Sequence, residues 1–393
     1  MQHQQASAAA GDALQAGFRN PPDAARPAGY WAWMNGYVDQ EQFGQELNEW
    51  KRRGLRKAYI FECGARDPQR IVPIGPAFLS AESVQAIGRA IREAGGLGIE
   101  LGFTTSSSWN AGGSWVTPEY ASMGLYPSTT TVQGPGKFTG VLPFPSSVPA
   151  RAPKRPDGRP MFYRDVAVLA VPAEEDRPAA GEVDLIPVRD LSQHLEADGR
   201  LTWDVPPGQW ALMRFVCTNT GQGLAIPSPK SEGLAIDHFS AAATRMHFEY
   251  LIRKLAREVG PLKNTPLTTM YLCSYELRGA AWTPDFLEQF QKRRGYDMKP
   301  YLPLLFGAKI ASREIADRFD YDYRKTQGDL LVDAFYRTAA DICHQHGLLL
   351  CAEAGGPGPP LHNVPVDALK AQGAMDIPRG EFWTDNHLWV ECH

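Results

Sequence analysis

The sequence lacks the features that mark membrane-spanning and nucleic-acid-binding proteins. It has no apolar run of the ~18 residues that a membrane-spanning helix needs. Lys and Arg number 40 against 44 Asp and Glu, so the net charge is -4, and the basic residues form no dense block. A chain of 393 residues with this charge balance has no electrostatic footprint for nucleic acid. We therefore expect neither a membrane span nor a nucleic-acid partner.

Paired cysteine motifs and a leader sequence are also missing. None of the six cysteines forms a CxxC pair. Four of them lie in or beside apolar, strand-like runs, at Cys63, Cys217, Cys273 and Cys351. This placement favours free buried thiols over disulfides or a zinc site. The first 18 residues have no basic start and no long apolar stretch, so we see no intact signal peptide.

Aromatic residues, glycine and proline are abundant instead. The chain has 10 Trp, 14 Tyr, 37 Gly and 32 Pro. Indole and phenol rings can stack on the apolar face of a sugar, although Trp is equally common in protein cores. Many Gly and Pro indicate long, shaped loops, which are the usual carriers of binding and catalytic groups.

Strand-like and helix-like segments alternate over most of the chain, and this rhythm predicts βα units and a parallel sheet. A β-rich stretch with many Pro, Gly and Thr interrupts it, with clear strands at 166–170 and 210–216 and a short strand and turn at 201–208. We expect an α/β fold of the (β/α)8-barrel type with a small antiparallel β subdomain inserted. The predicted parts are a lead-in (1–29), the first part of the barrel (30–124), the inserted subdomain (125–232) and the continuation of the barrel (233–393).

The βα segments supply about six strands, whereas a closed barrel has eight. The last residues, 388–393, stop in the middle of a pattern, so we expect the sequence to end before the barrel closes. An open doubly wound sheet is the alternative, but the sequence shows no Gly-rich phosphate loop in its support.

Helix boundaries in the second half follow from capping residues. Asp237 can cap a helix over 238–258, and Thr283 with Pro284 can begin the next helix. A long helix is expected over 312–346, with a break near Gln327 and Gly328.

Four carboxylates fall just past the predicted strands, where functional residues of a (β/α) barrel gather. Glycoside hydrolysis needs one carboxylic acid that protonates the leaving oxygen and a second carboxylate that activates water or attacks the anomeric carbon. The four positions are Glu62, Glu276, Glu353 and Glu381.

Glu276 is the best catalytic candidate. It follows an apolar strand and precedes Trp282, so we expect a semi-buried carboxyl whose neutral form is favoured, as a general acid requires. The structural alternative is a salt bridge to Arg278. Glu353 and Glu381 are candidates for the second carboxylate or for sugar contacts. The structural alternatives are that Glu353 anchors a tight turn and that Glu381 is the partner in an ion pair.

The remaining site candidates are aromatic or polar residues near the strand ends. Glu62 either contacts substrate or accepts hydrogen bonds from loop amides. Trp31 and Trp33 point to one side, and we expect Trp31 in the core and Trp33 in the site. The predicted substrate-binding residues are Trp33, Asn35, Glu62, Trp109, Asn110, Trp282 and Trp383.

Several short segments, in order along the chain, resemble the α-L-rhamnosidase family of glycoside hydrolases, family 106. No single segment identifies the family, but the whole set in this order is fairly specific for it. They include Phe18–Asp23, Tyr30–Gly36, Gly113–Pro118, Trp203–Gly208, Ser274–Glu276, Arg293–Tyr296, Tyr301–Pro303 and Gly380–Trp383.

The resemblance implies a catalytic (β/α)8 barrel and an inverting hydrolase of terminal α-L-rhamnose, with calcium near the sugar and a periplasmic or secreted location. It places Glu276 as one catalytic glutamate. The second is expected in an Ala-Glu-Ala-Phe-Thr-like segment, which this sequence does not contain. The open alternatives are a carbohydrate-binding protein without catalysis and a barrel glycosidase or lyase of other specificity; the oligomeric state is open.

Overall fold

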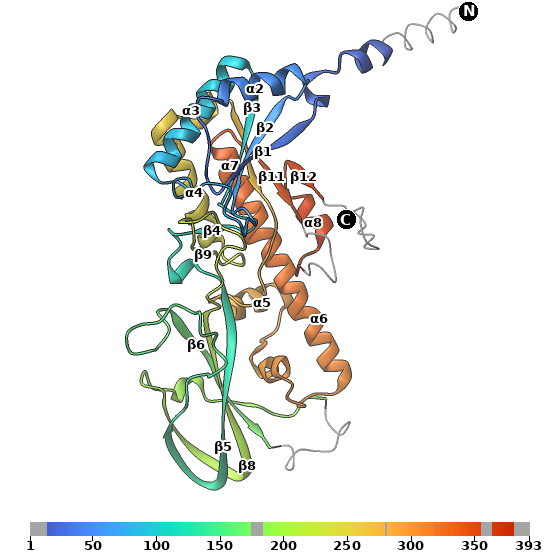
Figure 1. Ribbon diagram of the computed structural model, residues 1–393. Helices are drawn as coiled ribbons and strands as arrows, with labels where there is room; N and C mark the ends of the chain where they lie inside the picture. Colours follow the sequence, from blue (N-terminus) through green and yellow to red (C-terminus); the bar gives the residue numbers. More distant parts are fainter. Residues whose placement is uncertain (1–13, 174–183, 280, 355–363, 381–393) are drawn as a thin grey trace, which may run out of the picture.

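A single parallel sheet forms the centre of the molecule. The computed structural model describes residues 14–173, 184–279, 281–354 and 364–380. The sheet has six strands in the order β1-β2-β3-β10-β11-β12 (Figure 1). They are β1 (Ala28–Met34), β2 (Lys57–Cys63), β3 (Glu100–Thr104), β10 (Leu267–Leu272), β11 (Leu349–Glu353) and β12 (Ile377–Arg379).

The order of the strands in this sheet is their order in the sequence, and every neighbouring pair is parallel. A doubly wound sheet would reverse its strand order at a switch point. The described strands show no such reversal, so the doubly wound alternative is wrong for them. No pairing between β12 and β1 is present among the described residues, so the structure shows a mixed α/β fold with an open parallel sheet.

Strand β2 is covered on both faces, since all seven of its residues are buried. Strands covered on both faces are a property of parallel sheets. Ala58 and Ile60 belong to the main core under the helices. Tyr59 on the opposite face lies over Gly102 of β3, where an added Cβ would be only 2.2 Å from the ring. A glycine is therefore required at position 102 for this ring to lie against β3.

Helices pack against the outer face of the sheet, where α3 lies between α2 and α4 (Figure 1). Helix α3 begins at the Ser80 side chain, which accepts a hydrogen bond from the Ser83 amide, and ends at Gly98 in the left-handed conformation. The outer helices are α2 (Phe43–Arg52), α3 (Ala81–Leu97), α4 (Ala241–Val259) and α7 (Thr338–Gln345).

Three predicted helix boundaries are corrected. Ser240 rather than Asp237 caps α4, because Asp237 is buried and accepts a hydrogen bond of 2.6 Å from the Thr283 hydroxyl. With Thr283 engaged there, the next helix begins after Asp285. The long helix is interrupted by a π-helical segment and not at Gln327–Gly328. These elements are α5 (Phe286–Arg294), α6 (Arg313–Leu330) and the π-helix η7 (Leu331–Arg337).

An antiparallel sheet with its own small core extends away from the parallel sheet (Figure 1). Its order is β5-β8-β6-β7, and the two predicted strands at 201–208 and 210–216 form one continuous strand, β8. This strand pairs with β5 along almost its whole length. The strands are β5 (Met123–Val141), β6 (Tyr163–Pro172), β7 (Arg189–Asp190) and β8 (Arg200–Asn219), and a separate two-stranded pair joins β4 (Gly112–Gly113) to β9 (Leu234–Ala235).

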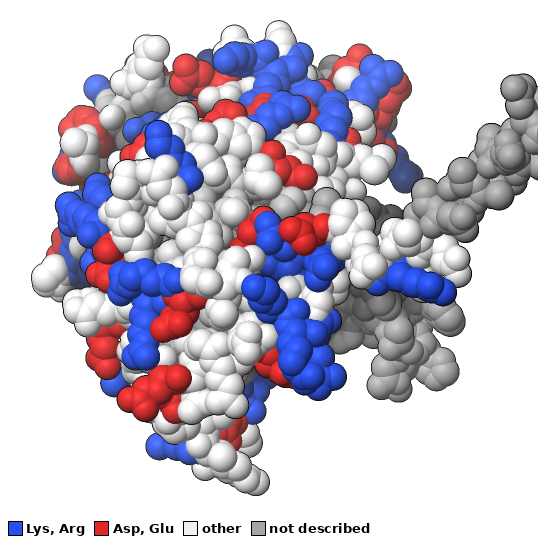
Figure 2. Space-filling view, turned by 90° about the horizontal axis from the view of Figure 1, so that it is seen from above, with Lys and Arg blue, Asp and Glu red and all other residues white. Residues whose placement is uncertain are grey.

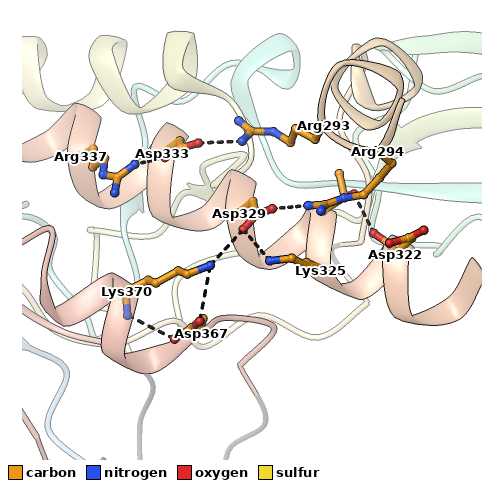
Figure 3. A network of polar contacts seen from close by, with 10 residues as sticks. Arg293, Arg294, Asp322, Lys325, Asp329, Asp333, Arg337, Asp367 and Lys370 are labelled. Carbon is orange, nitrogen blue, oxygen red and sulfur yellow. Dashed lines mark hydrogen bonds and ion pairs between the residues drawn. The ribbon is translucent and has the colours of Figure 1, made fainter. Parts of the chain in front are cut away.

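A network of ion pairs fastens α5 and α8 (Ala368–Gln372) to α6 and η7 (Figure 3). Asp329 on α6 is its centre: its carboxylate pairs with Arg294 of α5 and lies 3.9 Å from Lys370 of α8. Asp333 lies 2.8 Å from Arg293 of α5. Because these aspartates are only partly exposed, the pairs can fix the positions of α5 and α8 relative to the long helix.

The surface agrees with the balanced composition. On the face shown in Figure 2, acidic and basic side chains are interspersed. No helix among the described residues has the length and apolar character needed to cross a membrane. Short 3-10 helices complete the fold: η1 (Asp23–Ala25), η2 (Pro118–Tyr120), η4 (Ser192–His194), η5 (Leu262–Asn264) and η6 (Lys299–Phe306).

Candidate functional site

The inner face of the parallel sheet carries a cluster of aromatic and sulfur-containing side chains, separate from the main core. Alternation along each strand places every second residue on this face. The five described free cysteines are buried, as predicted, and three of them lie here. We call this group the interior cluster; it comprises Met34, Tyr59, Phe61, Cys63, Trp109, Tyr271, Cys273, Cys351 and Ile377.

Arg379 reaches across the interior from the last strand to the first. Its Nη1 donates a hydrogen bond of 2.7 Å to the Tyr30 hydroxyl on β1. Its guanidinium carbon also lies 4.9, 4.7 and 4.9 Å from the ring centroids of Tyr30, Tyr59 and Tyr271. Guanidinium groups bind favourably over aromatic faces at such distances. The contact between β12 and β1 shows that the sheet curves around its interior.

Glu353, the last residue of β11, is the register partner of Arg379 on β12 and has only 5% of its surface exposed. Its Oε1 accepts a hydrogen bond of 2.5 Å from the Tyr271 hydroxyl, which in turn lies 2.6 Å from the Tyr30 hydroxyl. The backbone carbonyl of Glu353 accepts a further bond of 3.0 Å from Tyr336. The structure thus brings Glu353 to the interior. A residue that only anchored a tight turn would not need the hydrogen bonds from Tyr271 and Tyr336.

Glu276 follows β10 and is exposed. Its Oε1 accepts a hydrogen bond of 3.3 Å from the Ser274 hydroxyl. The prediction of a semi-buried carboxyl is therefore wrong, because the loop after β10 turns this side chain outward while its neighbours Tyr275 and Leu277 are buried. The Ser274 amide donates to the Trp109 carbonyl at 3.0 Å, which ties this loop to the one that follows β3.

Glu62 lies near the end of β2, but it faces away from the interior and is 2% exposed. Burial raises the pKa of Glu62 to about 7, and the hydroxyls of Ser107 and Ser228 only partly oppose that shift. The donors near this carboxyl are these two hydroxyls, whereas the structural alternative from the sequence was hydrogen bonds from loop amides. The carboxyl is enclosed on the face away from the interior, which supports a structural role between loops, and its contact with substrate stays a prediction.

Two predicted sugar-binding tryptophans lie in the core instead. Trp33 is 2% exposed and stacks on Phe43 with ring centroids 5.4 Å apart, since it shares the outer face of β1 with Trp31. Trp282 is 1% exposed and stacks on Phe286 at 4.4 Å. Neither indole offers a face to a sugar.

Two predicted polar contacts hold loops together. Asn35 accepts a hydrogen bond of 2.7 Å from the Ala65 amide and donates one of 3.2 Å to the Val72 carbonyl. Asn110 is fully buried. It accepts a hydrogen bond of 2.7 Å from the Ala225 amide and donates one to the carbonyl of Gly223. These amides satisfy buried backbone groups, which is a structural role, and their role as substrate ligands stays a prediction.

Trp109 differs from the other predicted aromatic residues, because it is half-buried and belongs to the interior cluster. Its ring centroid lies 4.9 Å from that of Phe61. Glu381 and Trp383 lie outside the described residues.

The sequence interpretation missed Tyr30, Tyr59, Tyr271 and Arg379, which dominate the interior. The signal was available in part. Tyr59, Phe61 and Cys63 alternate along β2, and this alternation identifies one face of a strand. The strand pattern does not say which face is concave, so the choice between the two faces remained open.

The described residues contain no group of three or more His, Cys, Asp or Glu side chains placed to hold a metal ion. Calcium also takes backbone and amide oxygens as ligands, and the calcium expected from the family resemblance stays a prediction.

Comparison with known proteins adds independent findings. The family model for α-L-rhamnosidase, glycoside hydrolase family 106, matches residues 19–185 and 162–391. A relative from Formosa agariphila, with a provisional β-glucuronidase name, is 30% identical over 407 residues, which cover 96% of this chain and 33% of the relative. A rhamnosidase structure from Novosphingobium sp. PP1Y has a TM-score of 0.80 at 24% identity, covering 95% of this chain and 50% of that one.

The structural match shows a shared fold, and the family match spans most of the sequence in agreement with the ordered segments noted above. The chain spans about a third of the length of the Formosa relative and about half of the length of the rhamnosidase structure. On the family match, it belongs to the α-L-rhamnosidase family of glycoside hydrolases, family 106.

Proposed function

We propose that the protein acts as a glycoside hydrolase that removes terminal α-L-rhamnose, with its site at the carboxyl ends of the parallel strands. The observation that supports this most is the placement of two carboxylates after neighbouring strands, Glu276 after β10 and Glu353 at the end of β11. Paired carboxylates at one mouth of a (β/α) barrel suit glycoside hydrolysis. The curved, sequentially ordered sheet supports such a barrel.

In this proposal Glu276 is the proton donor to the leaving oxygen. Its carboxyl is exposed on the loop after β10 in this structure, so the burial that favours the neutral form of a general acid would have to come from the bound substrate, whereas Glu353 is already enclosed. Trp109 lies next to the same loop through the bond between its carbonyl and Ser274, and its half-buried ring can contact the apolar face of the sugar. Family membership is our reason for also proposing a periplasmic or secreted location.

The leaving group provides the test. We would measure kcat for the whole protein and its Glu276→Gln variant on an aryl rhamnoside with an activated phenol and on an alkyl rhamnoside. A lost proton donor should cost about 100-fold or more on the alkyl substrate and much less on the activated one, whose leaving group needs little protonation. Equal kcat of variant and wild type on the alkyl substrate would remove Glu276 from this role.

Glu288→Gln is the matched control, because Glu288 is an exposed carboxylate on α5. It should leave both rates unchanged. An aryl β-glucuronide belongs in the same assay, since the Formosa relative carries a β-glucuronidase name. Cleavage of that substrate in place of the rhamnosides would transfer the proposal to another sugar, and affinity without turnover would favour a binding protein.

A further inference from the structure

A chain of hydrogen bonds crosses the interior and ends on Glu353. Arg379 donates to the Tyr30 hydroxyl at 2.7 Å, the Tyr30 and Tyr271 hydroxyls are 2.6 Å apart, and the Tyr271 hydroxyl lies 2.5 Å from Glu353 Oε1. The chain joins four strands, β12, β1, β10 and β11. It is therefore a feature of the curved sheet and not of any local turn.

The chemistry of the four groups sets the direction of every bond. A guanidinium has only donors and stays protonated in proteins, so the Tyr30 oxygen must accept from it. Tyr30 then has its single proton to give to Tyr271. Tyr271 in turn has its single proton to give to the carboxylate. Because Tyr271 gives its only proton to Glu353, its oxygen must accept from Tyr30, so the chain runs from Arg379 to Glu353.

The phenols keep their protons throughout. Burial raises the pKa of Tyr30 to about 12, and it raises the pKa of Tyr271 far above the usual range of a tyrosine. Neither group becomes an acceptor-only phenolate at physiological pH. An aligned chain of this kind is also strengthened by mutual polarisation of its bonds.

We propose that this chain holds Glu353 as a fixed anion at the sugar site, with Arg379, Tyr30 and Tyr271 as positioning residues. The proposal rests on the proposed function for the statement that the anion serves a sugar site. An acceptor that receives a hydrogen bond from a donor-only chain is stabilised in its ionised form. Glu353 is therefore suited to accept hydrogen bonds from sugar hydroxyls or from water and not to donate a proton.

Among the residues that the structure describes, the other titratable groups near Glu353 do not replace this chain. Cys273, the residue directly after β10, lies 4.0 Å from its Oε1, and Cys351 lies two residues before it on β11. Burial raises the pKa of Cys351, so it remains a neutral thiol. Tyr336 binds the Glu353 carbonyl and not its carboxylate. Arg379 is thus the cation that this chain connects to the carboxylate.

Isosteric variants of the whole protein test the proposal. Tyr271→Phe and Tyr30→Phe remove one hydroxyl each from the chain and leave the rings in place. Tyr59→Phe is the control, because Arg379 lies over that ring while its hydroxyl is outside the chain. With a rhamnoside as substrate, the acid limb of kcat/KM should move up by roughly one pH unit in the first two variants and stay in place in the control.

Infrared difference spectra between wild type and Glu353→Gln supply a readout that needs no turnover. They should show the bands of an ionised carboxylate at pH 7, and those bands should persist to lower pH in wild type than in a Tyr271→Phe background. The carbonyl band of a protonated carboxylic acid at pH 7 would overturn the proposal. An acid limb of kcat/KM at the same pH in Tyr271→Phe and wild type would overturn it too. Ionised bands in a protein that cleaves no glycoside would instead overturn the proposed function and leave the ionised state of Glu353 intact.

Discussion

Glu62 offers a prediction whose size can be worked out. Burial raises its pKa from 4.5 to about 7 in the folded protein. Each unit of difference between the folded and unfolded states corresponds to about 1.4 kcal/mol, so the shift is worth about 3 kcal/mol. Because Glu62 is almost fully buried, solvent screening reduces this value little.

The sign follows from linkage. Below about pH 4.5 the carboxyl is protonated in both states and contributes no pH dependence. As the pH rises toward about 7, only the unfolded state loses the proton, so the folded protein loses up to about 3 kcal/mol of stability. Above the folded pKa both states are ionised and the loss is constant.

Glu62→Gln removes this titration and keeps the size of the side chain. We expect the free energy of unfolding of the variant, relative to wild type, to rise by about 3 kcal/mol between pH 4 and pH 8. Denaturant unfolding at several pH values measures it. Glu288→Gln, at an exposed carboxylate, should follow wild type.

Parallel stability curves for wild type and Glu62→Gln would refute the reasoning, since they would mean that Glu62 ionises as easily in the folded protein as in the unfolded chain.

Two further predictions concern packing. Gly102→Ala should cost about 1–3 kcal/mol, because its Cβ would lie 2.2 Å from the Tyr59 ring, whereas Gly96→Ala, with open space around it, should not destabilise. Equal stability of the two glycine variants in thermal unfolding would contradict the close approach. Trp282→Ala should cost about 3–5 kcal/mol without raising KM for a rhamnoside in the protein that remains folded. A raised KM with unchanged stability would instead identify Trp282 as a sugar contact.

The sequence predicts much of the parallel sheet, because each strand is a local apolar run and each helix has its own periodicity. The segments at β2 and β10 are examples of such runs. The π-helical break after Leu330 could not be predicted, since it depends on packing among distant elements. The same holds for β8, whose continuity is set by its pairing with β5.

The site was predicted less well, for a geometric reason. A one-residue step along β1 separates Trp33, on the outer face, from Met34, on the inner face. Alternation shows that two faces exist but does not identify the concave one. Glu353 was found because strand ends are visible in the sequence. Its partner Tyr271 is 82 residues away, and only the fold brings them together.

The most direct test of the account is turnover of an alkyl α-L-rhamnoside by the whole protein and by its Glu276→Gln and Glu353→Gln variants, followed as L-rhamnose released. We expect hydrolysis by the wild type and a loss of about 100-fold or more in kcat for each variant, because both carboxylates are proposed to take part in the reaction. Wild-type turnover in both variants would contradict the assignment of the site to the carboxyl ends of β10 and β11.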